Sequence, residues 1–130
     1  MSVVMTAERW RQLVNVNRVV NEDVRYRTDL DLYRQPEFWA IADDAGDCED
    51  YALAKRQRLL ALGWPLEALR LATCRIETGE GHAVLTIDTD AGAYVLDNRH
   101  AGVRAWRDLP YQWDRRQAAG GSHWVSVESP

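Results

Sequence analysis

A helical pattern begins near the middle of the chain at a cysteine, in the run Gly46-Asp47-Cys48-Glu49-Asp50-Tyr51-Ala52-Leu53-Ala54-Lys55. Gly46 interrupts the chain before this pattern, and Asp47 followed three residues later by Asp50 resembles the capping box of a helix start. Gly63 and the Trp-Pro pair after it form a stop signal. The sequence therefore predicts a helix over residues 48–62 that begins at the cysteine.

Strand patterns follow this helix. They cover residues 69–76, 82–88 and 93–96, and a further strand is expected at 123–127. Turn-rich tetrapeptides separate the first three runs, which indicates an antiparallel meander. Ala52 is small enough to let the helix lie close to such a sheet.

The first part of the chain is predicted to be helical. Apolar residues recur at helical spacing over residues 6–24, and Asn17 lies in the same stripe. A buried asparagine needs a hydrogen-bond partner, so we expect Asn17 to tie this helix to a neighbouring loop. Residues 26–35 are polar without a clear period and are expected to be irregular, while Pro36 opens a short helical piece over 36–40. Helices followed by strands predict an α+β fold.

The composition bounds the class of protein. The 130 residues are 46% hydrophobic and 28% charged, which fits one globular domain over 1–130. A net charge of −4 without a basic cluster argues against nucleic acid as the main partner. Two cysteines are too few for a disulfide scaffold or a four-thiolate zinc site. No apolar stretch can span a membrane and no signal peptide is visible, so we expect a cytoplasmic protein, or a periplasmic one if a signal has been removed.

Cys48 is the best candidate for a reactive side chain. A cysteine in the first turn of a helix feels the positive end of the helix dipole, which favours the thiolate, the form that attacks carbonyl groups. Cys74 lies instead in an apolar strand run, where a thiol behaves as a small hydrophobic group. A purely structural role for Cys48, as a buried residue at a helix start, stays open.

His82 and Asp97 are the candidate partners of this cysteine. If the strands over 82–88 and 93–97 pair around a tight turn, His82 lies directly opposite Asp97 at the open end of the hairpin, with both side chains on one face. A carboxylate in that position orients an imidazole and stabilises its charged form. A register slip of one residue would put the two on opposite faces. Taken singly, His82 can also be a strand-edge residue and Asp97 the start of an Asx turn.

Two later segments accompany the run around Cys48, namely Gly81-His82-Ala83-Val84-Leu85 and Val95-Leu96-Asp97-Asn98-Arg99. Together the three resemble the bacterial transglutaminase-like cysteine proteinases, and the similarity extends from about residue 14 to residue 124. The resemblance implies an α+β, papain/transglutaminase-like core in which the nucleophile helix packs on an antiparallel sheet. It also implies that Cys48 is the nucleophile, His82 the base and Asp97 the residue that orients the base.

The resemblance carries further expectations. The best-understood members of that family are periplasmic proteases that cleave surface adhesins near a pair of alanines and so release biofilms. They use calcium, and a membrane-bound receptor that reads cyclic-di-GMP holds them in check. For this chain the resemblance implies a protein substrate, a regulatory protein and calcium, with no organic cofactor. Because the chain has little outside the core, its substrate need not be an adhesin.

Three carboxylates beside the cysteine make a physical argument for calcium. Asp47, Glu49 and Asp50 place negative charge next to a thiol that has to ionise, and a bound hard cation would offset that penalty. Asp47 and Glu49 are the preferred ligands. The alternative is that Asp47 and Asp50 cap the helix while Glu49 faces solvent.

These residues favour a cysteine peptidase that works through a thioester acyl-enzyme. The backbone N–H of Cys48 is expected to hold the oxyanion, and by analogy with transglutaminases the indole N–H of Trp39 is a candidate second donor. A transglutaminase-type acyl transferase would use the same triad with an amine as acceptor. A catalytically silent binding module on the same fold is the third reading.

Overall fold

The structure is a computed structural model that describes residues 2–34, 44–118 and 124–126, with side chains described for 2–23, 48–118 and 124–126. Its elements are α1 (Ala7–Arg34), α3 (Asp44–Ala61), β1 (Leu69–Arg75), β2 (Gly81–Thr89), β3 (Gly92–Leu96), β4 (Arg104–Ala105), β5 (Gln112–Gln117) and β6 (Trp124–Ser126), with short 3₁₀ turns at Leu66–Ala68 and Trp106–Asp108. Helices come first and strands follow, as an α+β fold requires.

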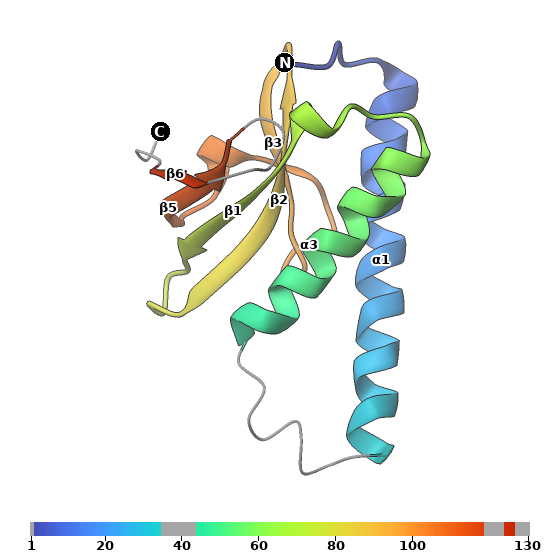
Figure 1. Cartoon of the computed structure of the whole chain (residues 1–130), viewed down its shortest axis with the longest axis vertical. Helices are drawn as coiled ribbons and strands as arrows, with labels where there is room; N and C mark the ends of the chain where they lie inside the picture. The colour runs from blue at the N-terminus through green and yellow to red at the C-terminus, as the bar shows by residue number, and fades with distance from the viewer. Residues whose placement is uncertain (1, 35–43, 119–123, 127–130) are drawn as a thin grey trace.

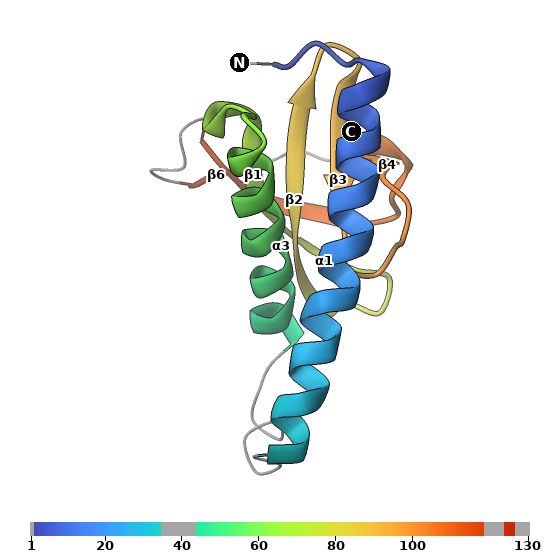
Figure 2. The same cartoon turned by 90° about the vertical axis from the view of Figure 1, so that its right-hand side faces the viewer.

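In the described part of the chain, two helices lie on one face of a six-stranded sheet. The strand order is β4-β3-β2-β1-β5-β6, and all neighbouring strands pair antiparallel. In Figure 1 both helices lie to the right of the sheet, and Figure 2, turned by 90°, shows α1 and α3 side by side in front of it, with α3 over its middle strands. The expected packing of the helix that carries Cys48 on an antiparallel sheet is confirmed.

The meander of β1, β2 and β3 is present as expected, but its register differs from the predicted one. Leu85 pairs with Leu96 and Thr86 with Val95. Continued by one step, this ladder sets Asp97 opposite Val84, two residues from His82 rather than directly opposite it. Because side chains alternate between faces, a shift of two keeps Asp97 on the face expected for it.

Helix α1 is longer than the sequence predicts. Residues 26–35 were expected to be irregular because they lack an apolar period, yet α1 continues to Arg34. In Figures 1 and 2 the last turns of α1 extend past the end of the sheet, so they have no sheet to pack on and need no apolar stripe. The short helical piece expected over 36–40 lies outside the described residues.

Helix α3 starts earlier than expected. It begins at Asp44, so Gly46 and Asp47 lie inside it, Asp47 is not its N-cap, and Cys48 is its fifth residue. A single glycine costs a helix only about 1 kcal/mol relative to alanine, which explains why Gly46 does not break it. The predicted end is confirmed: α3 stops at Ala61, and Gly63 follows with a φ of 95°.

Two apolar clusters hold the layers together. The cluster between helices and sheet contains Leu13, Val16, Val20, Ala52, Leu59, Leu85, Ile87 and Leu96. The opposite face of the sheet packs a second cluster against the segment before β5, with Ala72, Cys74, Val84, Val95, Leu109, Tyr111 and Trp113. The sequence analysis missed β4 and β5, because one is very short and the other is largely charged. The strand expected at 123–127 corresponds to β6, with its ends outside the described residues.

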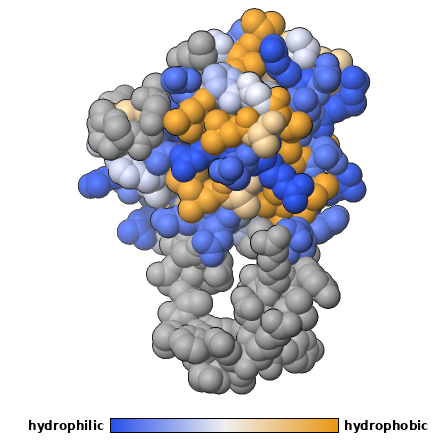
Figure 3. Space-filling view, turned by 45° about the vertical axis from the view of Figure 1, so that its right-hand side comes forward, coloured by the Kyte–Doolittle hydropathy of each residue, from blue (hydrophilic) through white to orange (hydrophobic). Residues whose placement is uncertain are grey.

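The surface on the helix side is mixed. In Figure 3 the hydrophobic residues form separate patches interrupted by polar ones. Such scattered apolar surface is ordinary for a folded domain. None of the helices in the described ranges is both long and apolar enough to cross a bilayer.

Candidate active site

Helix α3 and strand β2 bring Cys48 and His82 into direct contact. The Cys48 Sγ lies 2.9 Å from Nδ1 of His82, and both residues are buried, with 6% and 4% of their surface exposed. Cys48 lies in the N-terminal part of α3, and His82 is the second residue of β2. Because α3 packs along β2, two residues 34 positions apart in the chain become neighbours (Figure 1).

Asp97 completes a line of three side chains. Its Oδ1 lies 2.7 Å from Nε2 of His82, and the residue is 1% exposed. Asp97 comes directly after β3, which pairs with β2, so the hairpin itself delivers the carboxylate to the imidazole. The imidazole therefore uses one nitrogen for the thiol and the other for the carboxylate.

The proton on this line can occupy two positions. In the neutral form, the thiol donates to Nδ1 of His82; in the charged form, Nδ1–H donates to a thiolate, and in both Nε2–H donates to Asp97. Burial alone would lower the pKa of His82, but the hydrogen bonds to Asp97 and Cys48 outweigh it and raise that pKa to about 9. Burial likewise works to raise the pKa of Asp97, and the hydrogen bond to His82 more than offsets it, so that pKa is lowered. The geometry thus favours the charged imidazolium–carboxylate pair.

Tyr111 is a site residue that the sequence analysis missed. Its hydroxyl donates to Oδ2 of Asp97 at 2.5 Å, and its ring meets the His82 ring edge-on, with centroids 5.6 Å apart. The backbone N–H of Arg99 donates a hydrogen bond to Oδ1 of Asp97 at 2.9 Å, and the Arg99 guanidinium donates to the Tyr111 hydroxyl at 3.1 Å. Tyr111 lies just before β5, and nothing in its local sequence marks it as a partner of a residue 14 positions earlier.

Two asparagines of α1 hold the segment that carries Asp97. The Nδ2 of Asn21 donates to the backbone carbonyl of Asp97 at 3.1 Å. The Nδ2 of Asn17 donates to the carbonyls of His100 and Ala101, both at 3.0 Å. The prediction that Asn17 ties its helix to a loop is confirmed, and that loop is the one behind the candidate orienting residue.

Cys48 and His82 border a hollow of about 300 Å³ on the protein surface, with Tyr51, Glu80, Asn98 and Arg99 among its other lining residues. Cys74 does not line it. It pairs with His82 across β1 and β2 but is 3% exposed, and burial raises the pKa of its thiol to about 12. Cys74 therefore has the properties of a small core residue.

Two expectations about charge stabilisation need correction. The helix dipole acts mainly within the first turn, whereas Cys48 is the fifth residue of α3. At that depth the backbone N–H ordinarily bonds the carbonyl four residues earlier, so it is not the free oxyanion donor that the sequence suggested. Trp39, the other expected donor, lies outside the described residues.

The described residues do not assemble a calcium site. Glu49 and Asp50 are both exposed, and no group of three or more His, Cys, Asp or Glu side chains with metal-binding geometry occurs in the described ranges. The side chain of Asp47, the third expected ligand, lies outside them. Two solvent-facing carboxylates alone do not supply the six to eight oxygen ligands that calcium takes.

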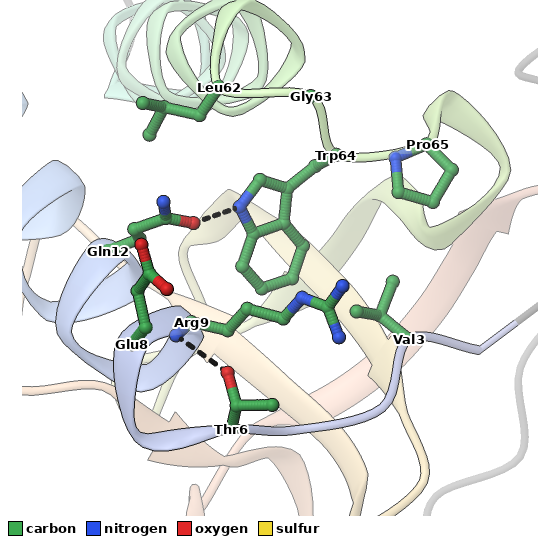
Figure 4. Close-up of a pocket in the computed structure, with 9 residues that line it drawn as sticks. All are labelled: Val3, Thr6, Glu8, Arg9, Gln12, Leu62, Gly63, Trp64 and Pro65. Carbon is green, nitrogen blue, oxygen red and sulfur yellow. Dashed lines mark hydrogen bonds between the residues drawn. The ribbon is translucent and has the colours of Figure 1, made fainter.

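A second hollow lies at the other end of the helices, away from the triad. Figure 4 shows that Thr6, directly before α1, and Arg9 and Gln12 of α1 line this hollow together with Trp64, whose indole N–H donates to Gln12 Oε1 at 2.7 Å. Its volume is about 350 Å³. None of the candidate catalytic residues lines it, so it is not the site of the chemistry.

A cysteine, a histidine and an aspartate joined in one hydrogen-bonded line form the kind of arrangement in which an imidazole can activate a thiol. The sequence model of the family described as bacterial transglutaminase-like cysteine proteinase (BTLCP) matches residues 1–130. The chain belongs to this family.

Solved structures agree with the fold. The chain is similar to LapG of Legionella pneumophila, with 20% identity and a TM-score of 0.65 over 89% of this chain and 67% of that one. It also matches EGTA-treated LapG from the same organism, with 20% identity, a TM-score of 0.65 and coverage of 90% and 66%. Calcium-bound LapG of the same organism matches with 23% identity and a TM-score of 0.54 over 64% of this chain and 49% of that one. The chain thus spans from about half to two thirds of the length of these proteins. No curated protein matches its sequence.

Proposed function

We propose that this protein is a cysteine peptidase that cleaves a protein substrate, with Cys48 as nucleophile, His82 as general base and acid, and Asp97 as the residue that orients His82. The observation that carries the proposal is the 2.9 Å contact between Cys48 Sγ and His82 Nδ1, continued by the 2.7 Å contact between His82 Nε2 and Asp97 Oδ1. Family membership supports the same chemistry.

The first half of the reaction makes an acyl-enzyme. The Cys48 thiolate attacks the carbonyl carbon of the scissile peptide, and the carbonyl electron pair moves to oxygen. When the tetrahedral intermediate collapses, the C–N bond breaks and Nδ1–H of His82 gives its proton to the leaving amine. The products of this half are a thioester on Cys48, a neutral His82 and a released amine.

The second half returns the enzyme to its starting state. His82 Nδ1 takes a proton from a water molecule as its oxygen attacks the thioester carbonyl. Collapse breaks the C–S bond, releases a carboxylic acid and restores the thiolate–imidazolium pair. Throughout, the hydrogen bond from Nε2–H to Asp97 fixes the ring so that Nδ1 faces the sulfur.

The hollow beside the triad suits a segment of polypeptide. It is open to the surface, and its rim carries the exposed side chains of Glu80 and Arg99. An adhesin substrate, release of biofilm, a regulatory protein and a periplasmic or cytoplasmic location remain predictions from the sequence.

Calcium binding by this chain is also kept as a prediction, and no step of the mechanism uses the ion. The similarity to a LapG structure described as calcium-bound supports testing it. Thermal unfolding of the chain in calcium and in EGTA is the direct test: a higher melting temperature in calcium supports binding, and identical curves reject it.

Product analysis by mass tests the proposed activity. Wild-type protein and Cys48→Ala are incubated with a library of proteome-derived peptides, with and without a primary amine such as cadaverine. New peptide termini that appear with the wild type alone support a peptidase. Amine-adducted peptides without new termini would show a transferase instead. No change in any peptide, with a Cys48 thiol no more reactive than free cysteine, would leave a binding module.

A further inference from the structure

Lys55 is the single lysine of the chain, and the other 15 of its 16 Lys and Arg residues are arginines. Lysine is almost never fully buried unless it is paired. Here the side chain is 0% exposed and ranks first among the largest fully buried side chains. A buried amine of this kind has to be explained by what surrounds it.

Lys55 lies on the same helix face as the candidate nucleophile. It follows Cys48 by seven residues, about two turns of α3, and Ala52 between them is 1% exposed. Its Nζ is buried and has no hydrogen-bond partner within the described part of the chain. Nζ lies over the ring of Tyr51, 5.7 Å from its centroid.

The charges that act on Lys55 belong to the triad. Burial lowers its pKa to about 7, and the negative charges of Asp97 and Cys48 oppose that shift. Helix α1, which packs against α3, contributes the buried amides of Asn17 and Asn21 in this layer, and their Oδ1 atoms are buried and unpaired in the described structure. Asn21 touches Asp97 through that residue's backbone carbonyl.

We propose that Lys55 is a positioning residue for the triad: its buried ammonium is the counter-ion of the Cys48–His82–Asp97 group and favours the form in which Cys48 is a thiolate. This inference rests on the proposed function. It involves no covalent step, because Lys55 acts only through the electrostatic attraction between its ammonium and the negative charge of the triad.

A charge count shows why one cation suffices. With the Asp97 carboxylate ionised, the triad carries a net charge of −1 both as thiol–imidazole and as thiolate–imidazolium. The same holds for the tetrahedral intermediate, where the oxyanion and the imidazolium cancel. One ammonium therefore balances the charge at every stage. Because Lys55 lies on the same helix face as Cys48 and responds to charge on Cys48, it is expected to stabilise the form in which that charge is present, the thiolate. Lysine suits this place better than arginine, because a guanidinium presents five donors that would each need a partner in the core.

Lys55→Met tests the proposal, because methionine fills a similar volume without the charge. The readout is the rate at which iodoacetamide alkylates Cys48 across the pH range. We expect the rate near pH 6 to fall about tenfold and the pH of half-maximal rate to rise by about one unit. Arg58→Met, which removes an exposed cation from the same helix, is the matched control and should change neither.

Two results would overturn the proposal. One is a Lys55→Met profile that superimposes on the wild-type profile. The other is a lower melting temperature with an unchanged profile, which would show that Lys55 only fills space. If the wild-type Cys48 itself reacts like a free thiol, the proposed function fails instead.

A second measurement gives the titration midpoint of the Lys55 side chain itself and does not require a variant of Lys55 to fold. Protein labelled with ¹³C,¹⁵N-lysine gives one side-chain signal, because the chain has one lysine. Its titration midpoint in the wild type is expected far below that of an exposed lysine, and lower still in Asp97→Asn, where an attractive charge is lost. A midpoint like that of an exposed lysine, or one that Asp97→Asn leaves unchanged, would contradict the proposal.

Discussion

Tyr111 donates a 2.5 Å hydrogen bond to Oδ2 of Asp97, the carboxylate oxygen that His82 does not use. Each oxygen of this buried carboxylate therefore has its own partner, and the backbone N–H of Arg99 adds a third bond. A carboxylate held in this way cannot rotate away from the imidazole. The orientation of His82 thus depends on a tyrosine from the segment before β5.

Tyr111→Phe removes that bond and keeps the ring. We expect the rate of Cys48 alkylation near neutral pH to fall about tenfold, by analogy with metal sites, where partners that orient a ligand are worth about 10–100-fold. Tyr94→Phe, a half-buried tyrosine on β3, is the control and should react like the wild type. Equal alkylation rates in Tyr111→Phe and the wild type would show that the hydrogen bond from Tyr111 is not needed to orient Asp97.

Asn17→Ala tests how the loop behind Asp97 is held. In this variant the carbonyl of Ala101 loses its bond from Asn17, and the carbonyl of His100 keeps only the longer bond from Asn21, at 3.4 Å. We expect the free energy of unfolding, measured in urea, to fall by about 1–3 kcal/mol because a buried network is broken. Asn15→Ala, an exposed asparagine on the same helix, should cost less than about 0.5 kcal/mol. Equal losses in the two variants would contradict this role of Asn17.

Several parts of this fold and site could be predicted because their signals are local. The cysteine, histidine and aspartate each lie near the start or end of an element that the sequence pattern predicts, and the hairpin pattern put His82 and Asp97 on one face. The predicted register differs from the observed one by two residues, and because such a shift keeps a side chain on the same face of the sheet, the predicted face of Asp97 was still correct. The end of α3 was predicted because Gly63 adopts a positive φ that few other residues tolerate.

Other parts depend on contacts that no local pattern encodes. Tyr111 joins the site only because β5 pairs with β1 and carries its preceding segment next to Asp97. The burial of Lys55 depends on how α3 meets α1 and the sheet, and a lysine beside arginines on a helix reads as a solvated residue. The early start of α3 was missed because glycine is a weak helix breaker.

The pH dependence of stability should differ between the wild type and Lys55→Met. His82, with its pKa raised from 6.5 to about 9, contributes stability that is full below pH 6.5 and is lost as the pH rises through about 9. Lys55, with its pKa lowered from 10.5 to about 7, has the opposite sign: the unfolded chain binds its proton more tightly, so stability rises between about pH 7 and 10.5. The two slopes oppose each other between pH 7 and 9.

In Lys55→Met the rise in stability that comes from Lys55 is absent, and only the loss of stability that comes from deprotonation of His82 remains. Its free energy of unfolding should therefore fall relative to the wild type between pH 7 and 9, as measured by urea denaturation at several pH values. Arg58→Met should track the wild type over the same range. Parallel curves for Lys55→Met and the wild type would refute the assigned burial of the amine.

The two cysteines should differ sharply in reactivity. Cys74 is buried in the sheet and does not line the hollow, whereas Cys48 does. Native protein treated briefly with iodoacetamide should gain the mass of one carbamidomethyl group. Cys74→Ala should still gain one and Cys48→Ala none. Two additions in the native wild type would show that Cys74 is accessible.

The rate of Cys48 alkylation as a function of pH, in the wild type and in His82→Ala, tests the central claim most directly. With a thiolate–imidazolium pair in place, the wild-type rate should hold a plateau that extends well below pH 8, and His82→Ala should lose it. Ordinary thiol behaviour in both proteins would contradict the claim that Cys48 and His82 form an activated pair.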